Sequence, residues 1–451
     1  MVMENRYDKY KDSGIAWIGE IPKHWEVRRM KSIYNFGKGL NITKADLVNK
    51  GIPVISYGQI HSKLNTGTCI KDSLIKYVPE SFLENNNTSL VKKGDIIFAD
   101  TSEDLEGCGN CIYIDRDMLL YAGYHTIIAK NISTYINKYF SYLFQTDCWR
   151  TQIRKTVNGV KLFSIPQRLL ASTDIITPST QEQQSIATYL DQKCGEIDEL
   201  MTLQEEMITK LQSYKQSVIT EAVTKGLDKN VPLKDSGIEW IGEIPEHWEA
   251  SKTLFNLSMP ITDGPHTTPE LFEIGIPFVS AEAVSFGNGR IDFSRIRGYI
   301  SENFYQECCK KYVPQVDDIY MIKSGATTGR VAIVDTDIKF TIWSPLAVFR
   351  CNKERMLPRF LFYQLQSNGY QKQIELNWSY GTQQNIGMRT LEKLILSVPP
   401  LSEQQSIADY LDQKCSEIDE LISIKQQKIE KLKDYKKSLI FECVTGKRKV
   451  S

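Results

Sequence analysis

Two long stretches of the chain, residues 181–225 and 403–444, repeat apolar residues at the seven-residue spacing of helices that pack together. A proline and a serine precede the first stretch, and Thr180 with Gln183 matches the S/T-x-x-E/Q capping box that begins a helix. A glycine follows each stretch and predicts its end. We therefore predict two helices of about 44 residues, each roughly 65 Å long at 1.5 Å per residue, that pack antiparallel as a rod.

The apolar side chains of these helices predict the seam along which the helices meet. Polar residues interrupt it, with Gln204 in the first helix and Lys425 and Lys428 in the second. A heptad seam is first of all a structural feature, and we interpret the rod in that way. The predicted seam contains Leu190, Ile197, Leu200, Met207, Leu211, Tyr214 and Val218, and in the second helix Leu411, Ile418, Leu421, Leu432, Tyr435 and Leu439.

The segments outside these helices, residues 28–180 and 251–401, contain short apolar runs separated by turn residues, which is typical of strands. Each segment, called a centre below, also has one helical pattern, at residues 137–154 and 358–375. We predict a mixed α+β domain with a strongly curved sheet in each centre. The clearest predicted strands are residues 52–56, 95–99, 111–114, 126–129, 277–280, 319–323, 330–334 and 346–349.

The chain is an internal repeat. Residues 11–26 and 234–249 agree at 14 of 16 positions, at an offset of 223, and residues 182–200 and 403–421 agree at 17 of 19, at an offset of 221. These matched blocks are called frames below, and between them the two copies differ almost completely. A period of this length indicates a duplicated domain and not a solenoid, so the chain resembles a fused homodimer with pseudo-twofold symmetry.

The net charge of zero hides an uneven distribution along the chain. The first centre carries 19 Lys+Arg and 13 Asp+Glu, a net of +6, and the second carries 16 and 14, a net of +2. Residues 181–250 carry 6 and 14, a net of −8. The mildly basic centres permit contact with nucleic acid but do not require it.

The composition, with 41% hydrophobic and 24% charged residues, is that of a globular protein. Residues 1–11 show no apolar region of a secretory signal, and no run of about 18 apolar residues predicts a membrane span. The ten cysteines are scattered along the chain. We therefore expect reduced thiols, a cytoplasmic location and no membrane partner.

Signatures of catalysis and metal binding are missing from the sequence. There is no G-x-x-x-x-G-K-[ST], H-E-x-x-H or G-x-S-x-G motif, and no N/D-P-P-aromatic tetrapeptide of adenine methyltransferases. Cys108 and Cys111 form a lone C-x-x-C without the second pair of a zinc site, which favours incidental cysteines over a metal or redox role. His24 and His247 occupy equivalent frame positions, which favours a structural role. We predict no catalytic residue and no metal ligand.

Polar loops in the two centres are the candidate contacts with DNA. Residues 323–330 form a small polar loop flanked by cations, and residues 381–385 offer side-chain amides, which pair with adenine edges. Ordinary solvent-exposed turns are the competing interpretation, and cations here would more often touch phosphate, which positions without specifying. The candidates are Tyr57, Gln59, Lys63, Thr101, Ser102, Tyr124, Asn158, Lys161, Lys323, Ser324, Thr327, Thr328, Arg330, Thr382, Gln383, Gln384 and Asn385.

The frame D-S-G-I-x-W-I-G-E-I-P-x-H-W-E resembles the start of each recognition unit in specificity subunits of type I restriction–modification systems. The helix opening E-Q-Q-x-I-A-x-Y-L-D-x-K, from Glu182 and again from Glu403, is similar to the long helices of that family, and V-T-K-G-L-D from Val223 is similar to its linker. The resemblance covers essentially the whole chain. It implies an α+β fold with two mixed target-recognition domains separated by a pair of long antiparallel coiled-coil helices.

The resemblance also implies a sequence-specific DNA-binding subunit without a catalytic site of its own. Each centre would read one half of a bipartite asymmetric site, and the rod would suit half-sites one to two turns apart at about 34 Å per turn. The implied partners are double-stranded DNA, two DNA-methyltransferase (modification) subunits and two restriction/translocase subunits. S-adenosylmethionine, ATP and Mg are expected on those partners, and no cofactor on this chain. The alternatives are a coiled-coil assembly scaffold without base readout and a methyltransferase or nuclease in one chain.

The predicted domain boundaries follow the repeat: residues 1–180 and 227–401 for the recognition domains, and 181–226 and 402–451 for the long helices. Bulky apolar residues of the frames leave two roles open, because they can belong to the domain core or contact a partner subunit. These residues are Trp17, Pro22, Trp25, Trp240, Pro245 and Trp248.

Overall fold

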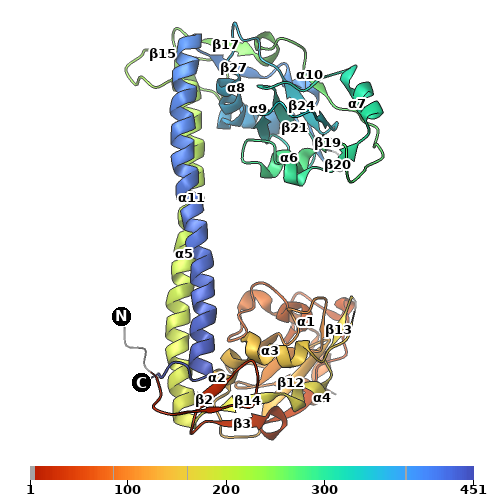
Figure 1. Cartoon of the computed structure of the whole chain (residues 1–451), viewed down its shortest axis with the longest axis vertical. Coiled ribbons are helices and arrows are strands. Elements are labelled where there is room, and N and C mark those ends of the chain that lie inside the picture. Colours follow the sequence, from red (N-terminus) through yellow and green to blue (C-terminus); the bar gives the residue numbers. More distant parts are fainter. Residues whose placement is uncertain (1–5, 85, 160, 381–382, 451) are drawn as a thin grey trace. The chain divides into compact units, whose positions relative to one another are not determined.

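The computed structural model describes residues 6–84, 86–159, 161–380 and 383–450. Its contacts divide the chain into two compact units, unit 1 with residues 1–204 and 427–451 and unit 2 with residues 205–426. The divisions fall within the two long helices, α5 (Thr180–Lys225) and α11 (Leu401–Val444) (Figure 1). Each unit therefore contains one α+β domain, the first part of one long helix and the last part of the other.

The strands of unit 1 are β1 (Tyr10–Asp12), β2 (Glu20–Pro22), β3 (Glu26–Arg29), β4 (Tyr34–Lys38), β5 (Ile52–Ile55), β6 (Lys76–Val78), β7 (Leu90–Val91), β8 (Ile96–Ala99), β9 (Thr101–Ser102), β10 (Cys111–Tyr113), β11 (Leu120–Ala122), β12 (Thr126–Asn131), β13 (Phe163–Ser164) and β14 (Asp174–Thr177). One four-stranded sheet has the order β10-β8-β12-β4 and the other β6-β5-β11-β7. Only β5 and β11 pair in parallel among these described strands. Short pairs β1-β2, β3-β14 and β9-β13 complete the unit.

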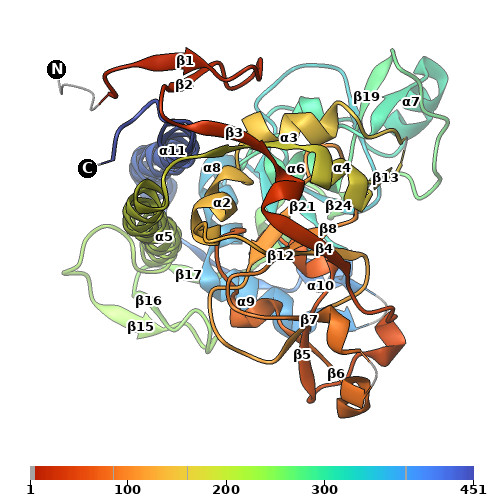
Figure 2. The same cartoon turned by 90° about the horizontal axis from the view of Figure 1, so that it is seen from below.

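The helices of unit 1 besides the long ones are α1 (Tyr57–Ile60), α2 (Asn137–Leu143), α3 (Asp147–Arg154) and α4 (Gln167–Ser172). Helices α2 and α3 bring Tyr139, Phe140 and Trp149 into one core with Phe98 of β8. The same core includes Leu190 of α5, so the recognition domain is anchored to the start of that helix. Figure 2 shows β1 and β2 beside the end of α11, which belongs to the same unit.

Unit 2 repeats this topology. Its strands are β15 (Leu233–Asp235), β16 (Glu243–Pro245), β17 (Glu249–Lys252), β18 (Thr262–Asp263), β19 (Ile276–Val279), β20 (Gly298–Ile300), β21 (Ile319–Ile322), β22 (Val331–Ile333), β23 (Thr341–Ile342), β24 (Leu346–Phe349), β25 (Ser379–Tyr380), β26 (Gln384–Asn385) and β27 (Ile395–Val398), and its helices α6 (Ala281–Phe286), α7 (Glu302–Cys309), α8 (Pro358–Gln366), α9 (Asn368–Asn377) and α10 (Met388–Leu391). The sheet order β18-β24-β21-β22 matches the first sheet of unit 1, and β20-β19-β23 matches the second sheet without an equivalent of β7. The predicted mixed α+β class and its duplication are confirmed.

The predicted strands are confirmed to within two residues, but two other expectations are wrong. Each centre divides its strands between separate sheets and does not form one strongly curved sheet. Each predicted single helix is two helices, α2 with α3 and α8 with α9. The break has a local cause in unit 2, because Ser367 is extended, with ψ 148°, and its hydroxyl caps α9 by accepting from the N–H of Tyr370.

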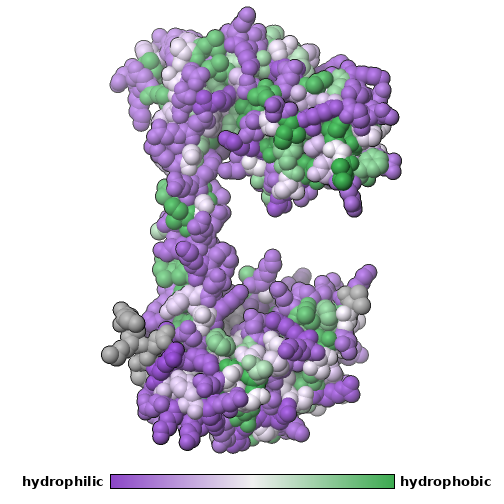
Figure 3. Space-filling model, viewed as in Figure 1, coloured by the Kyte–Doolittle hydropathy of each residue, from purple (hydrophilic) through white to green (hydrophobic). Residues whose placement is uncertain are grey.

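The long helices meet along a seam shifted from the predicted one. Leu190, Ile197 and Val218 are buried as expected, and the interleaved buried positions are Cys194 and Ala222. The predicted interleaved residues Leu200, Met207, Tyr214, Leu421 and Tyr435 are exposed, and apolar patches are visible on the helix surface in Figure 3. Ion pairs bind the helices antiparallel inside each unit, Lys436 to Asp198 at 2.6 Å in unit 1 and Lys215 to Asp419 at 2.7 Å in unit 2.

The capping box of α5 lies one residue before its predicted position. The side chain of Glu182 accepts from the N–H of Ser179 at 3.3 Å, and the Ser179 hydroxyl accepts from the N–H of Glu182 at 3.3 Å. Gln183 is instead buried, and its amide bridges the N–H of Ile136 and the carbonyl of Pro178. Across the described part of the chain, no helix is long and apolar enough to cross a membrane.

Candidate nucleic-acid interface

Segments far apart in the sequence of unit 1 meet where β8 ends. The N–H of Ile165 donates to the carbonyl of Asp100 at 2.7 Å, beside the pair β9-β13. The N–H of Asp100 donates in turn to the carbonyl of His125 at 3.1 Å, in the turn between β11 and β12. The N–H of Tyr57, at the start of α1, donates to the carbonyl of Tyr124 at 3.1 Å. These hydrogen bonds join α1, the loop after β8 and the β11–β12 turn into one surface.

Two predicted contacts of the first centre lie together on this surface. The rings of Tyr57 and Tyr124 are 6.1 Å apart, and Tyr124 is 38% exposed. The predicted contacts Lys63, Asn158 and Lys161 are also exposed. Aromatic rings and exposed cations are groups that stack on bases and neutralise phosphates.

Three other candidates of the first centre have their polar atoms inside the unit. The side-chain oxygen of Gln59 accepts from the N–H of Ser56 at 3.0 Å and closes the capping box of α1. Thr101 and Ser102 are buried, and the Ser102 hydroxyl donates to the carbonyl of Asp104 at 2.7 Å. These contacts favour structural roles. The S-x-x-Q pattern from Ser56 is the signal that indicates this role for Gln59.

His61, which the sequence did not single out, fastens the loop after β8 to α1. Its Nε2 lies 2.8 Å from the carbonyl of Thr101, and its Nδ1 lies 3.1 Å from the amide nitrogen of Asn110. A carbonyl only accepts, so Nε2 carries the proton and Nδ1 accepts from Asn110. Arg150 donates to the side-chain oxygen of Asn110 at 2.7 Å. Both ring nitrogens of His61 are therefore used within the unit.

The second centre brings its two candidate loops together in the same way. Ser324 and Asn385 form an antiparallel bridge, and the N–H of Gly325 donates to the carbonyl of Gln384 at 2.9 Å. Gln383 and Asn385 are exposed, and Gln384 is half-buried. The candidate Thr382 lies outside the described residues. The amide-bearing hairpin and the loop 323–330 thus form one surface of unit 2.

Helix α6 completes that surface. The Ser285 hydroxyl donates to the hydroxyl of Thr327 at 3.1 Å, and Arg330 donates to the carbonyl of Ser285 at 3.0 Å. Arg330 remains exposed. With Thr328, Arg330 also lines a polar groove of about 370 Å³ that reaches Gln216 of α5.

Lys323 differs from the other predicted cations because its ammonium lies against a buried carboxylate of its own unit. Its ammonium lies 3.3 Å from the carboxylate of Asp263, which is 1% exposed and also contacts Lys311 and His266. Burial opposes ionisation of Asp263, but the hydrogen bond and charge of Lys311 and then the charge of Lys323 outweigh it and lower its pKa. The predicted role of Lys323 as a DNA contact is therefore not favoured by its placement.

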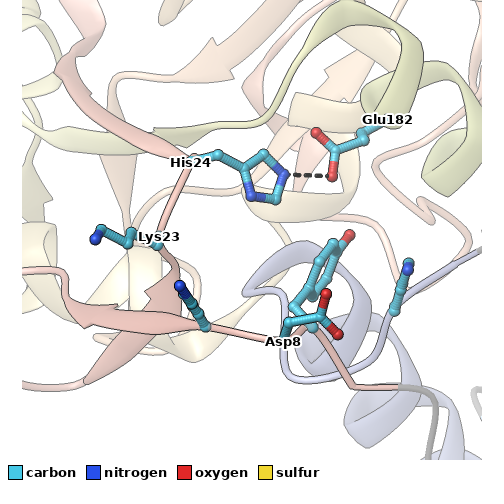
Figure 4. A pocket seen from close by; sticks show the side chains of 7 residues that line it. Asp8, Lys23, His24 and Glu182 are labelled. Atoms are coloured by element: carbon cyan, nitrogen blue, oxygen red, sulfur yellow. Dashed lines mark hydrogen bonds and ion pairs between the residues drawn. The ribbon is translucent and has the colours of Figure 1, made fainter.

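The frames place a histidine and a tryptophan on the glutamate at the start of each long helix. In unit 1, His24 Nε2 lies 2.9 Å and Trp25 Nε1 3.2 Å from Glu182. Figure 4 shows the contact of His24 with Glu182, beside Lys23 and Asp8. In unit 2, His247 and Trp248 make the same contacts with Glu403, at 2.7 and 3.0 Å. In each copy of the repeat, the same two contacts therefore join the first matched block to the last.

The bulky frame residues divide between the two roles that the sequence left open. Pro22, Trp25, Pro245 and Trp248 are buried, which favours the core role. Trp17 is half-buried under the ammonium of Lys155, 4.4 Å from its ring centroid. Trp240 is 39% exposed and remains available to a partner.

The C-x-x-C cysteines are buried thiols. Burial raises the pKa of Cys108 and raises that of Cys111 to about 12. Such thiols stay protonated at neutral pH, whereas a metal ligand must be a thiolate. Within the described ranges, no group of three or more His, Cys, Asp or Glu is placed to hold a metal ion.

The family described as the type I restriction modification DNA specificity domain matches residues 22–210 and 266–434. The chain belongs to this family. One matched segment falls in each copy of the repeat, so the chain contains two DNA specificity domains. The predicted role as a type I restriction–modification specificity subunit is confirmed.

Similar proteins agree over most of the chain. The MjaX specificity subunit assigned to a type I restriction enzyme of Methanocaldococcus jannaschii is 26% identical over 457 residues, covering 100% of both chains. The EcoBI specificity subunit of Escherichia coli is 24% identical over 267 residues, which is 58% of this chain and 55% of that protein.

Two solved structures share the fold. A chain from a study of assembly and conformational transition of the type I R-M system has a TM-score of 0.69 at 18% identity, covering 94% of this chain and 99% of that one. The HsdS subunit from Thermoanaerobacter tengcongensis has a TM-score of 0.50 at 16% identity, covering 94% and 98%.

Proposed function

We propose that each unit of this specificity subunit reads one half of a bipartite, asymmetric DNA site. The observation that carries the proposal is a contrast within the repeat. The same strand order recurs in both units, whereas the side chains that follow the equivalent strands β8 and β21 differ, with Asp100 in one and Lys323 in the other. One frame repeated twice suits two copies of one partner, and two different surfaces suit two different half-sites.

The proposed partners are two DNA-methyltransferase subunits and, in the complete complex, two restriction subunits. S-adenosylmethionine, ATP and Mg belong to those partners, and this cytoplasmic chain carries neither a cofactor nor a catalytic site. The likeness in fold to a chain from the type I R-M system supports this assembly. In each unit, the proposed base and phosphate contacts are the exposed candidates Tyr124, Lys161, Arg330 and Asn385, with the half-buried Tyr57 beside Tyr124.

An exchange of recognition domains tests the proposal. Residues 28–180 are replaced by the same region of a relative, the chain is produced with its methyltransferase subunit, and methylated adenines in the host genome are mapped by long-read sequencing. One half of the methylated motif should change and the other should stay. The matched exchange of residues 251–401 should change the opposite half. A change in both halves after either single exchange would contradict the modular assignment.

Two further measurements separate the other function classes. A gel shift compares the methyltransferase alone with the methyltransferase bound to this chain, at several salt concentrations. Sequence-specific binding only with the chain, falling steeply with salt as phosphate contacts release counterions, supports the proposal, whereas no gain in binding indicates a scaffold. Labelled S-adenosylmethionine, incubated with DNA and this chain alone, should give no methyl transfer, and any transfer would contradict a non-catalytic subunit.

A further inference from the structure

The β11–β12 turn of unit 1 holds an imidazole between two tyrosine rings. The ring of His125 lies 5.6 Å from that of Tyr57 and 4.0 Å from that of Tyr124, both in edge-on arrangements. The turn approaches α1 closely at Gly123, where an added Cβ would lie 2.2 Å from the Ser56 hydroxyl. The position of this imidazole is therefore fixed by α1 and by the turn itself.

The backbone at His125 also indicates a fixed position. Its φ is +53°, a left-handed value that is uncommon outside glycine. Such conformations persist only where the surrounding structure enforces them, and they gather at functional sites. Here the enforcing contact is the backbone hydrogen bond from the N–H of Asp100 to the carbonyl of His125.

Asp100 also contacts the ring of His125. The carboxylate lies 2.8 Å from Nδ1, and the two side chains are 32% and 36% exposed, respectively. An ionised carboxylate only accepts hydrogen bonds, so Nδ1 carries a proton. In the neutral ring Nε2 is then the acceptor, and no described residue is its partner. His61 is the contrast in the same unit, because both of its nitrogens are engaged.

We propose that His125 is a specificity-determining residue of unit 1, which accepts a hydrogen bond at Nε2 from the exocyclic amino group of an adenine or cytosine. Asp100 is a positioning residue that fixes the tautomer. In the major groove these amino groups are the donors that distinguish adenine and cytosine from thymine and guanine on the same strand. The inference rests on the proposed function, since it names a contact within the half-site assigned to unit 1.

The experiment compares two variants in the complete chain produced with its methyltransferase subunit, with the host genome as the DNA and long-read mapping of methylated adenines as the readout. His125→Asn removes the imidazole, and asparagine tolerates the left-handed backbone. Asp100→Asn keeps the shape of the pair but no longer holds the proton on Nδ1.

His125→Asn should relax one position of one half-site, so that thymine or guanine is accepted there with discrimination reduced about tenfold. Asp100→Asn should shift the same position towards guanine or thymine, because an imidazole with its proton on Nε2 donates to their carbonyl oxygens. Asp174→Asn, at a carboxylate of β14 that is 28% exposed and pairs with Arg29 at 3.2 Å, is the matched control and should leave the motif unchanged. The unchanged half-site shows in each case that the complex is folded.

An unchanged motif in both variants would overturn the inference, and so would a uniform loss of methylation, which indicates a purely structural pair. A change confined to the half-site of unit 2 would also overturn it. If the unmodified chain directs no bipartite methylation, the proposed function itself fails, and that failure is seen before any variant is compared.

Discussion

The main sheets of the two units have the same strand order, but the charged residues that follow equivalent strands differ in sign and in the burial of their partners. After β8, Asp100 faces a solvent-accessible His125, and both side chains are about one third exposed. After β21, Lys323 is 13% exposed and faces Asp263, which is 1% exposed. The first pair is therefore accessible at both side chains, whereas the carboxylate of the second pair is buried. A charged residue in a recognition loop therefore identifies a nucleic-acid contact only when its partner is known.

The largest expected effect concerns the buried tryptophan of each frame. It tests whether the two frames, which are nearly identical in sequence, contribute equally to stability. Trp25→Ala and Trp248→Ala each remove a buried indole that packs against its frame and hydrogen-bonds a helix-start glutamate. Each should lower the free energy of unfolding of its own unit by about 3–5 kcal/mol. Hydrogen exchange across a urea series, resolved by unit, measures both. Unequal losses would show that the frames differ in energy despite their shared contacts.

The second prediction contrasts the two acidic residues of the recognition domains. Asp263→Ala leaves Lys323, whose side chain is 13% exposed, without its counter-charge and should destabilise unit 2 by about 3 kcal/mol. Asp100→Ala removes a half-exposed partner and should cost unit 1 less than about 1 kcal/mol. Thermal unfolding combined with hydrogen exchange separates the two. Equal losses would contradict the difference in burial between the two carboxylates.

The start of α5 gives a smaller, pH-dependent effect. Burial opposes ionisation of Glu182, but hydrogen bonds from His24, Ser179 and Trp25 outweigh it and hold its pKa below the ordinary 4.5. Its stabilising effect is therefore complete above about pH 4.5 and is lost as the pH falls through the lowered pKa. Glu182→Gln should lower the free energy of unfolding by about 1 kcal/mol at neutral pH. It should also reduce the further loss of stability as the pH falls. Denaturation curves measured from about pH 3 to about pH 7 compare the two proteins. The same loss of stability on acidification in both would contradict this prediction.

The smallest expected effect concerns the cations of unit 2. Arg330→Ala should weaken DNA binding and reduce the slope of log affinity against log salt by about 1, because an exposed guanidinium neutralises one phosphate. Lys323→Ala should reduce the slope by less than Arg330→Ala does, because the Lys323 side chain is 13% exposed and its ammonium lies against the carboxylate of Asp263. Titrations of the methyltransferase complex at several salt concentrations measure both slopes. Equal slopes for the two variants would show that the two cations are equivalent.

Local sequence patterns predicted the helices and strands well, but they predicted poorly which face of each helix is buried. The bounds of α5 and α11 follow from capping and end signals in the sequence, and the strands from short apolar runs. The heptad seam was half right, because the spacing of seven fits both the buried Cys194 and the exposed Leu200 as neighbours of Ile197. Only contact with the second helix distinguishes these two faces.

The candidate contacts show the same limit. Tyr124 and Arg330 are exposed, as a contact with DNA requires, but residue type also suggested Gln59 and Lys323, whose polar groups make contacts inside their units. His125 gave no signal in the sequence, since its left-handed backbone and its contact with Asp100 arise from the pairing of β8 with β12.

The sequence by itself determined the duplication, most of the secondary structure, the absence of known catalytic motifs and the family. These properties depend on residues that are neighbours along the chain or match at a fixed offset. The tertiary structure decided which cation lies against a buried carboxylate, which helix face is buried and which histidine has a ring nitrogen without a partner among the described residues. Those outcomes depend on partners far away in sequence, such as Asp263 for Lys323, 60 residues apart. Hydrophobic packing of the sheets brings such distant residues together, and no local sequence pattern predicts this packing.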